Sequence, residues 1–346
     1  MQDLRDFTLE ELKIKFIELG FEKYKAEQIF LWLNKKNIND FDLMTNLSKN
    51  FVLQLKKYFT IKAFFCVKHL KSEDKTEKFL FKLEDGNCIE TVLIKTQKRK
   101  TLCLSSQVGC KIQCPFCFSG KIGFIRNLKT YEIVNQVLKV SEITKNKITN
   151  IVFMGIGEPL YNYENLIKSI KIINNVKGLG IGARKITVST CGIIPGILKL
   201  MNFPLQIELS VSLHATNDKL RNELVPINKK YPLKDLLAIC KEYYKKTNRI
   251  ITLEYIILNN KNDSLRDMER LSNLSKQINA KVNLIEYNTI NIGVDGVGKK
   301  SSIERCKQIL SKNGVNVTIR KSKGKDIMAA CGQLVALNTD YALRDR

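Results

Sequence analysis

The sequence has few prolines, few histidines and no long apolar run. Only 6 of its 346 residues are proline and no stretch is of low complexity, which excludes a largely disordered chain. No apolar segment approaches the roughly 20 residues that a membrane-spanning helix needs. The N-terminus is acidic and amphipathic, unlike a secretion signal. We therefore expect a folded, cytoplasmic protein with no membrane segment.

Acidic residues are also in short supply. The chain has 58 Lys and Arg against 34 Asp and Glu, which gives a net charge of +24 and a pI near 9.6. An excess of this size indicates a polyanionic partner such as nucleic acid. Codon bias is the alternative explanation, because 46 of these residues are Lys and only 12 are Arg. If the lysines served only to keep the surface solvated, the number of acidic residues would be raised together with the number of lysines, and it is not. The net charge therefore favours nucleic-acid binding.

Hydrophobic periodicity divides the chain into three parts. Helical spacing predicts helices over 8–19, with Thr8 as the N-cap, and over 23–36 and 39–58. Strand-like segments at 60–70, 78–83 and 88–95, with a turn at 84–87, predict a small antiparallel set. We therefore expect a helical accessory domain over 1–60, a small β extension over 61–98 and a larger α/β domain over 99–346.

The third part alternates between strand-like and helical segments. Apolar runs occur at 101–105, 150–154, 184–189, 206–212, 250–257, 281–286 and 315–320. Helical segments lie between them near 130–145, 162–175, 232–247, 264–278 and 301–313. This alternation predicts a parallel sheet of βα units, either open or rolled into a partial barrel. Active-site groups of such folds gather where the strands end.

Three cysteines follow the first strand of this α/β part. Cys110, Cys114 and Cys117 are separated by three and then two residues, so three thiolates can wrap one face of a cubane iron–sulfur cluster and leave the fourth iron open. A zinc site is the alternative, but it normally needs further Cys or His ligands. The chain has no second CxxC or HxxxH pair and only two histidines, His69 and His214. The spacing therefore favours a cluster over zinc.

The other cysteines are not paired by any visible pattern. Ten cysteines in a reducing compartment are better explained by metal binding or redox chemistry than by structural disulfides. Isolated cysteines in apolar surroundings usually behave as small buried hydrophobic residues. We expect this of Cys66, Cys191, Cys240 and Cys306.

Glycine and polar residues follow the next strands. Residues 154–159 read MGIGEP, in which the glycines permit close approach of a ligand and the carboxylate can accept hydrogen bonds from an amino group. Ser189, Thr190, Ser212 and His214 end two later strands and suit the hydroxyls of a ribose and the carboxylate of an amino acid. Tight turns and helix caps explain each feature singly. Their joint placement favours a binding site.

Together, these motifs carry a resemblance. The cysteine triad followed by Phe118 resembles the signature of the radical S-adenosylmethionine (SAM) superfamily, and the surrounding segments resemble its RlmN/Cfr family of RNA adenosine methyltransferases. The match runs from about residue 85 to 338 through the blocks ETVLI, TLCLSSQVGC, FMGIGEPLYN, SLHATND, LVPINKKYPL and AACGQL. The resemblance implies a partial (β/α)6-type radical SAM barrel, a [4Fe-4S] cluster and S-adenosyl-L-methionine as cofactors.

The resemblance also implies roles for individual residues. Cys331 would be methylated first and would then pass its methyl carbon to the adenine through a radical. Cys103 would release the product by forming a transient disulfide, and Glu90 would accept the ring proton. Residues expected to line the SAM pocket by the same resemblance are Gly157, Glu158, Ser189, Ser212, Leu213, His214 and Asn288.

The family divides by target carbon. RlmN-like members methylate carbon 2 of an adenosine in 23S rRNA, and often of one in tRNA, whereas Cfr-like members methylate carbon 8. Cfr has alanine in the place of Pro159, so the sequence favours carbon 2. We expect a monomer that uses an electron donor such as a flavodoxin system. Carbon 8, and less favoured a zinc-bearing RNA-binding protein, remain the alternatives.

Overall fold

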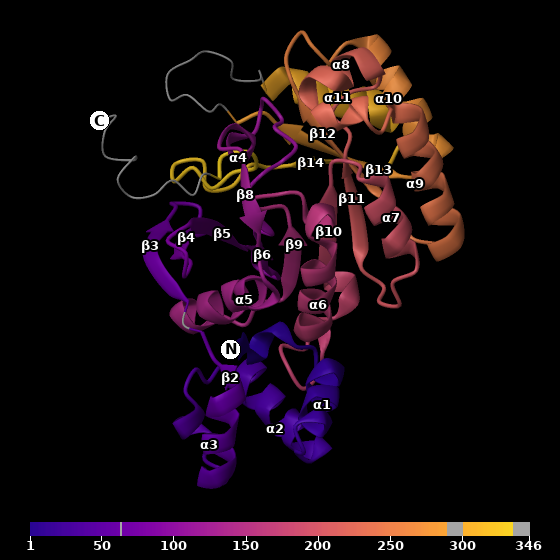
Figure 1. Ribbon diagram of the computed structural model, residues 1–346. Coiled ribbons are helices and arrows are strands. Elements are labelled where there is room, and N and C mark those ends of the chain that lie inside the picture. The colour runs from indigo at the N-terminus through magenta and orange to yellow at the C-terminus, as the bar shows by residue number, and fades with distance from the viewer. Residues whose placement is uncertain (63, 289–299, 335–346) are drawn as a thin grey trace.

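The computed structural model describes residues 1–62, 64–288 and 300–334. An N-terminal group of helices lies at one end of the molecule, and a large sheet flanked by helices forms the rest (Figure 1). Within the described residues, no helix has the length and apolar character that crossing a membrane requires.

The N-terminal group contains three helices. They are α1 (Leu9–Glu18), α2 (Lys23–Asn34) and α3 (Lys49–Tyr58), with the short 3-10 helices η1 (Leu4–Asp6) and η2 (Phe41–Leu43). Strands β1 (Gln2–Asp3) and β2 (Phe59–Thr60) pair in parallel and join the two ends of this group. Thr8 caps α1 as expected, because its hydroxyl accepts from the Glu11 N–H while the Glu11 carboxylate accepts from the Thr8 N–H.

The single helix predicted over 39–58 is wrong in its first half. The Ser48 hydroxyl accepts a hydrogen bond from the Phe51 N–H and begins α3, whereas the Asp40 carboxylate accepts from the Asp42 N–H and begins η2. Between these caps, Asn46 accepts a 2.5 Å hydrogen bond from the Trp32 indole N–H, which holds the segment on α2. Side chains that bond locally to the backbone compete with a continuous helix.

The three antiparallel strands are confirmed and extend the main sheet, but the first begins at Phe65 rather than at residue 60, because Phe59–Thr60 pairs with β1 instead. They are β3 (Phe65–Lys71), β4 (Glu77–Lys82) and β5 (Cys88–Lys95). Strand β5 pairs antiparallel with β6 (Lys100–Cys103), which in turn pairs in parallel with β9 (Asn150–Phe153). The β extension and the α/β part therefore share one sheet, whose order is β14-β13-β12-β11-β10-β9-β6-β5-β4-β3.

From β6 to the β14 edge, every neighbouring pair of strands in this sheet is parallel, as the alternating pattern predicts. The further strands are β10 (Ile186–Thr190), β11 (Glu208–Ser212), β12 (Thr252–Ile257), β13 (Lys281–Glu286) and β14 (Val317–Arg320). The connecting helices include α5 (Thr130–Thr144), α6 (Tyr163–Asn174), α7 (Ile194–Met201), α9 (Leu233–Thr247), α10 (Leu265–Gln277) and α11 (Lys300–Lys312). The parallel strands follow one another in sequence order, and β14 and the antiparallel strand β3 form the two edges of the sheet. This arrangement is the expected partial barrel.

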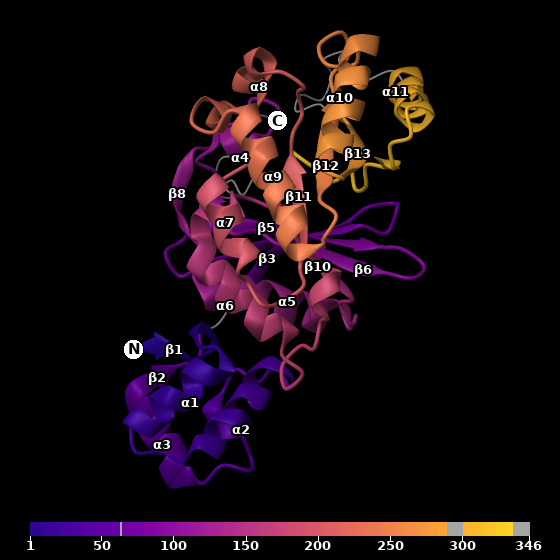
Figure 2. The same ribbon diagram turned by 90° about the vertical axis from the view of Figure 1, so that its right-hand side faces the viewer.

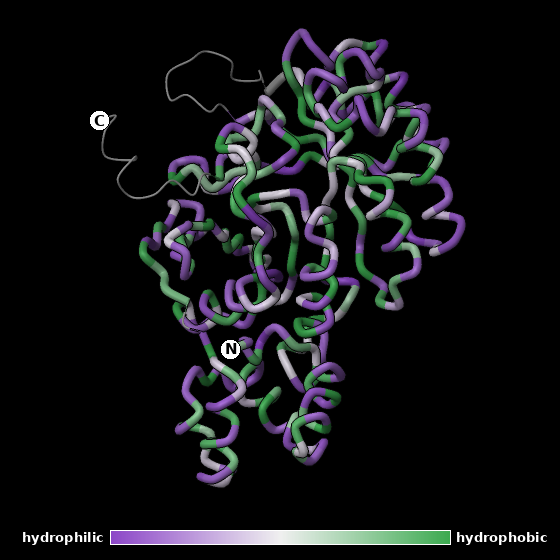
Figure 3. Tube along the Cα trace, viewed as in Figure 1, coloured by the Kyte–Doolittle hydropathy of each residue, from purple (hydrophilic) through white to green (hydrophobic). Residues whose placement is uncertain are grey.

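Helices cover one side of the curved sheet, and loops close the other. Helices α7, α9 and α10 lie along the outer side, and the strands are among the more hydrophobic stretches of the trace (Figures 2 and 3). Two shorter helices, α4 (Phe118–Lys121) and α8 (Asp218–Leu224), and the strand pair β7 (Gln107–Gly109) and β8 (Phe124–Asn127) lie in the connections. The inner side thus remains available for a site.

The N-terminal helices share a core with the barrel. Phe16 is fully buried and packs edge-on against Phe21 and Phe51. The same cluster includes Leu138 of α5 and Ile172 of α6. Burial of a phenylalanine side chain contributes about 1.5–3 kcal/mol, so this cluster stabilises both the helical group and its attachment to the barrel.

Replacing Phe16 tests this core. We expect Phe16→Ala to lower the free energy of unfolding by about 3–5 kcal/mol, because it opens a cavity among closely packed rings. The matched control is Ile17→Ala, one residue along the same helix and 57% exposed, which should cost less than about 0.5 kcal/mol. Urea denaturation followed by circular dichroism measures both, and equal losses would contradict this packing.

Candidate active site

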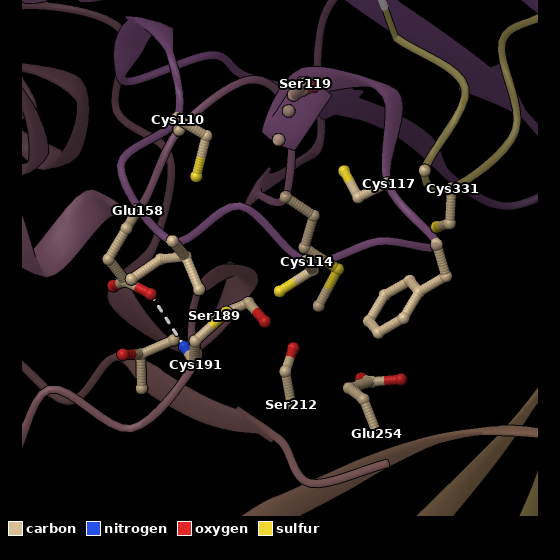
Figure 4. Close-up of a pocket in the computed structure, with 18 of the residues that line it drawn as sticks. Cys110, Cys114, Cys117, Ser119, Glu158, Ser189, Cys191, Ser212, Glu254 and Cys331 are labelled. Atoms are coloured by element: carbon tan, nitrogen blue, oxygen red, sulfur yellow. Dashed lines mark hydrogen bonds between the residues drawn. The ribbon is translucent and has the colours of Figure 1, made fainter. Parts of the chain in front are cut away.

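A pocket lies at the carboxyl ends of the parallel strands, where the fold predicts one. Its lining comes from six consecutive strands of the sheet, or from the residues just after them, and from two loops. The lining residues on or just after these strands include Met154, Gly157, Glu158, Ser189, Thr190, Ser212, His214, Glu254, Ile256, Ile285 and Arg320, and several of them are drawn in Figure 4. Cys331 and Gly332 reach the pocket from the C-terminal loop.

The cysteine triad lines this pocket as one loop. Cys110, Cys114 and Cys117 lie between β7 and α4, and their sulfur atoms stand apart around the cavity (Figure 4). The loop is held by hydrogen bonds from the Cys110 N–H to the Gly123 carbonyl at 2.8 Å and from the Cys117 N–H to the Cys114 carbonyl at 3.0 Å. Gly120 lies so close that an added Cβ would meet the Cys114 nitrogen at 2.9 Å. The sequence thus folds a short glycine-containing loop around the thiols.

The triad fits a cluster. Burial raises the pKa of the Cys110 thiol and of the Cys117 thiol, so these groups need bound cations to stay ionised. Among the described residues, no three His, Cys, Asp or Glu side chains are arranged around a single metal ion. A cubane cluster takes one thiolate on each of three irons, so its ligands stand apart, as these sulfur atoms do. The three thiols therefore fit one face of a cubane cluster.

Glu158 is fixed by backbone groups. Its Oε1 accepts from the Leu160 N–H at 3.0 Å and its Oε2 from the Cys191 N–H at 2.7 Å, while its own N–H donates to Gln107 at 2.8 Å. Burial raises the pKa of its carboxyl to about 7. Side-chain hydrogen bonds with Thr190 and Cys191 also act on this carboxyl and oppose the effect of burial on its pKa. Gly157 before it has a φ of +102°, a conformation that favours glycine.

The serines and the histidine follow the neighbouring strands. Ser189 and Ser212 line the pocket, and so does His214, which has a left-handed φ of +60°. The Nδ1 atom of His214 accepts from the Ile256 N–H at 3.1 Å, and burial lowers the pKa of the ring to about 3. His214 is therefore neutral with its proton on Nε2. Leu213, in contrast, is fully buried in the core and does not line the pocket.

The C-terminal loop is docked on the cysteine loop. The Gly332 carbonyl accepts from the Phe118 N–H at 2.7 Å, and the Ser119 hydroxyl donates to the Leu334 carbonyl at 2.8 Å. Asn288, which is buried just beyond β13, donates from its side chain to the Cys331 carbonyl at 3.3 Å. Asn288 thus lies beside the C-terminal loop rather than in the lining of the pocket. These contacts place Cys331 at the edge of the cluster pocket.

A second cavity brings Cys331 and Cys103 together. It adjoins the first and shares Met154, Ile285, Arg320 and Cys331 with it, and Cys103 at the end of β6 lines it. Both sulfur atoms are free thiols. Burial, followed by the charge of Cys331, raises the pKa of Cys103 to about 12. Two thiols more than two hundred residues apart in sequence therefore face one cavity beside the cluster loop.

Glu90 lies next to this cavity. It is buried on β5, on the same strand face as Val92 and Ile94, which line the second cavity. Its Oε1 forms an ion pair of 3.0 Å with Lys78 Nζ, and Lys78 also donates to the Met328 carbonyl at 3.2 Å. Glu90 is thus linked to the loop that carries Cys331.

Three residues of the site were not expected from the sequence. Cys191, assigned above to the core, instead lines the pocket, where a hydrogen bond with Cys114 and burial raise the pKa of its thiol. Glu254 and Arg320 also line it. A charged residue inside the apolar run 250–257, and one that ends the run 315–320, are signals that could have identified these two. Of the other isolated cysteines, Cys240 and Cys306 are buried as expected, whereas Cys66 is partly exposed.

The chain is similar to known proteins over nearly its whole length. The model of the radical SAM superfamily matches residues 104–271, and that of the ribosomal RNA large subunit methyltransferase N-terminal domain matches residues 2–61. A protein of Clostridium novyi named probable dual-specificity RNA methyltransferase RlmN is 44% identical over 335 residues, covering 96% of this chain and 98% of the relative. The chain belongs to the RlmN family of radical SAM methyltransferases.

Further RlmN relatives agree. A Thermotoga maritima protein of the same name is 45% identical over 338 residues, covering 96% of this chain and 97% of the relative. The crystal structure of a radical SAM methyltransferase from Sphaerobacter thermophilus has a TM-score of 0.91 and 40% identity, covering 97% of this chain and 100% of that one. The expected fold class is confirmed, as are S-adenosyl-L-methionine and a [4Fe-4S] cluster as the cofactors of this methyltransferase.

The glycine of the SAM-pocket motif offers a test. An added Cβ at Gly157 would lie 2.5 Å from Gln107 Cβ, and the residue has a positive φ, so Gly157→Ala must shift the loop that carries Glu158. We expect SAM to bind the reconstituted variant at least about tenfold more weakly, which corresponds to a loss of about 1.4 kcal/mol of binding free energy. Isothermal titration calorimetry measures this affinity.

The matched control for this variant is Gly182→Ala. No atom lies within 4 Å of a Cβ added at Gly182, and its φ is −58°. Its affinity for SAM should be unchanged. Equal affinities of the two variants would contradict a role for the Gly157 loop in the pocket.

Proposed function

We propose that this RlmN-family chain methylates carbon 2 of an adenosine in 23S rRNA, and also in tRNA, through a methylated cysteine and a transient disulfide. The observation that carries this proposal is the pair of thiols, Cys103 and Cys331, at one cavity beside the cluster loop. The relatives are named dual-specificity RNA methyltransferases, and the net charge of +24 suits an RNA substrate.

The adenine ring makes the chemistry demanding. Its carbon 2 is not nucleophilic, so it cannot take a methyl group directly from a sulfonium. Bound SAM, together with the cluster, supplies both a methyl group and the radical that activates it. Every other step falls to side chains of this chain.

Cys331 accepts the methyl group in this mechanism. Its position at the junction of the two cavities suits the transfer, because one cavity holds the cofactor motifs and the other holds Cys103. Once the methyl carbon is joined to the ring, carbon 2 gives its proton to Glu90 and the ring also gives up one electron, which the bound cofactors would take back, so that the adduct has no unpaired electron. Lys78 holds the Glu90 carboxylate at 3.0 Å and orients it toward the loop of Cys331.

Cys103 then releases the product. Its thiolate attacks the Cys331 sulfur, and the sulfur–sulfur bond forms as the bond from that sulfur to the bridging carbon breaks. The electron pair of the broken bond stays on the carbon, which takes up a proton and becomes the methyl group. The disulfide is afterwards reduced by a thiol reductant.

The remaining proposals concern the cofactor pocket and the RNA. Gly157, Glu158, Ser189, Ser212 and His214 would bind SAM, with Leu213 contributing only its backbone and Asn288 positioning the Cys331 loop. Basic residues at the second cavity, Arg99, Lys321 and Lys323, suit RNA phosphates.

We also propose a division of the chain into domains, with residues 1–60 as the accessory domain, 61–98 as the β extension and 99–346 as the catalytic part. We further propose that the chain is a cytoplasmic monomer and that a flavodoxin-like donor supplies electrons to its cluster.

Carbon 8 is the second candidate. The segment Gly157–Glu158–Pro159 favours carbon 2, because Pro159 stands where Cfr has alanine. Pro159 is the first residue of the 3-10 helix η3 (Pro159–Asn162), a position at which the fixed φ of proline suits a helix start.

Mass spectrometry of RNA decides between the two carbons. 23S rRNA and tRNA from cells that lack adenosine-C-methylating enzymes should gain 2-methyladenosine when this chain is expressed. Synthetic 2-methyladenosine and 8-methyladenosine serve as chromatographic standards. The Cys114→Ala variant, which loses a proposed cluster ligand, should leave the RNA unmodified. Formation of 8-methyladenosine would contradict the proposal for carbon 2, and unmodified RNA with active cofactors would contradict RNA as the substrate.

The role of Cys103 is tested by trapping. We expect Cys103→Ala to accumulate RNA bound covalently to Cys331, because no thiol remains to break the carbon–sulfur bond. Denaturing gels and peptide mass spectrometry detect the adduct. Cys66→Ala, which changes a partly exposed cysteine on β3, should behave as the unmodified chain does. Free methylated RNA formed at the normal rate by Cys103→Ala would refute the assignment.

A further inference from the structure

Arg320 occupies the junction of the two cavities. It is the last residue of β14, pairs in register with Ile285 of β13, and lines both cavities together with Cys331. Its Nη1 lies 2.9 Å from Met154 Sδ, which fixes the direction of the side chain. A guanidinium in such a position must face negative charge to offset the loss of water.

Three groups supply that charge. The thiolate form of Cys331, then the Glu254 carboxylate and the thiolate form of Cys103 raise the pKa of Arg320 against the effect of burial. Glu254 is 3% exposed and lines the cluster pocket on the same side as Cys331 (Figure 4). Its Oε1 accepts from Asn283 at 3.2 Å, and its Oε2 has no hydrogen-bond partner among the described residues. Arg320 thus faces one carboxylate and both reactive thiols.

Cys103 depends on such a cation. With its pKa raised to about 12, the thiol is almost entirely protonated at neutral pH, and a protonated thiol is a poor nucleophile. Two charged groups act on it from neighbouring elements, namely Cys331 of the C-terminal loop, whose charge raises its pKa, and Arg320 of β14, whose charge lowers it. The other basic residues at the same cavity are Arg99, Lys321 and Lys323.

We propose that Arg320 stabilises the Cys103 thiolate during product release. The inference rests on the proposed function, in which Cys103 attacks the sulfur of Cys331. Arg320 and Cys103 line the same cavity, so the guanidinium can offset the charge of a thiolate there. At this step Cys331 is a neutral thioether, so the Cys103 thiolate and the Glu254 carboxylate are the anions that Arg320 faces.

A purely structural role for Arg320, as the counter-charge of Glu254, makes different predictions. In that case the ionisation of Cys103 would not depend on Arg320, and removing Glu254 would not affect Cys103. The two roles are therefore distinguished by the reactivity of a single thiol, without any RNA.

The experiment follows alkylation of Cys103 by iodoacetamide in the cluster-loaded full-length protein. Peptide mass spectrometry gives the rate from pH 6 to 10, and Cys66 on β3 serves as the internal reference. Cys331→Ala represents the neutral, methylated state. Adding Arg320→Gln to Cys331→Ala should move the alkylation profile of Cys103 upward by about one pH unit or more, a rate loss of about tenfold at neutral pH. Adding Arg320→Lys instead should restore much of the rate.

One further comparison addresses the fold. Adding Glu254→Gln to Cys331→Ala should speed alkylation, because Arg320 loses its competing carboxylate; a misfolded variant would not give this gain while Cys66 reacted normally. An unchanged profile after Arg320→Gln would overturn the proposal.

Failure of the proposed function would give a different result. If the thiol reactivities shift as expected but neither Arg320→Gln nor Cys103→Ala accumulates an RNA adduct, the assigned reaction is wrong while the electrostatic role of Arg320 stands. If Cys103→Ala traps RNA but Arg320→Gln changes neither the pH profile nor the adduct, the reaction stands and the role of Arg320 is refuted.

Discussion

The docking of the C-terminal loop on the cysteine loop is the contact on which the rest of the site depends. Two hydrogen bonds, Phe118 N–H to the Gly332 carbonyl and Ser119 hydroxyl to the Leu334 carbonyl, join segments more than two hundred residues apart. Without them, Cys331 would belong to a surface loop with no fixed relation to the barrel. With them, its sulfur lies between the cofactor pocket and the cavity of Cys103. Two hydrogen bonds thus hold the C-terminal loop against the cysteine loop and bring Cys331 to the site.

Burial makes ionisation of the cysteine thiols at this site unfavourable. A thiol removed from water ionises poorly, which affects Cys103, Cys110 and Cys117 alike. Cations must therefore accompany the cysteines if they are to act as thiolates. Iron supplies positive charge to the cysteine triad of this family, whereas Cys103 is not a member of the triad. A side-chain cation at the second cavity meets the same need there, and Arg320 is placed to provide it.

Sequence reasoning identified features that repeat or cluster, and it missed features that rest on one residue. The parallel strands and long helices follow from apolar periodicity, which many residues support together, whereas the short helices α7 and α8 have too few turns to show it. The cysteine triad was visible because its spacing is local. The pairing of Cys103 with Cys331 came only from the family resemblance, since no local pattern relates residues so distant. Cys191 was assigned to the core because an apolar neighbourhood in sequence does not reveal a pocket wall.

The position of Arg320 also bears on how a buried thiol could act as a nucleophile. The guanidinium lines the same cavity as Cys103, where that cavity adjoins the cluster pocket. In the proposed release step the sulfur of Cys331 is a thioether and carries no charge, so Arg320 would face the Cys103 sulfur and the Glu254 carboxylate. Burial alone keeps the thiol protonated, and a cation held in the wall of the cavity offsets that effect without admitting water.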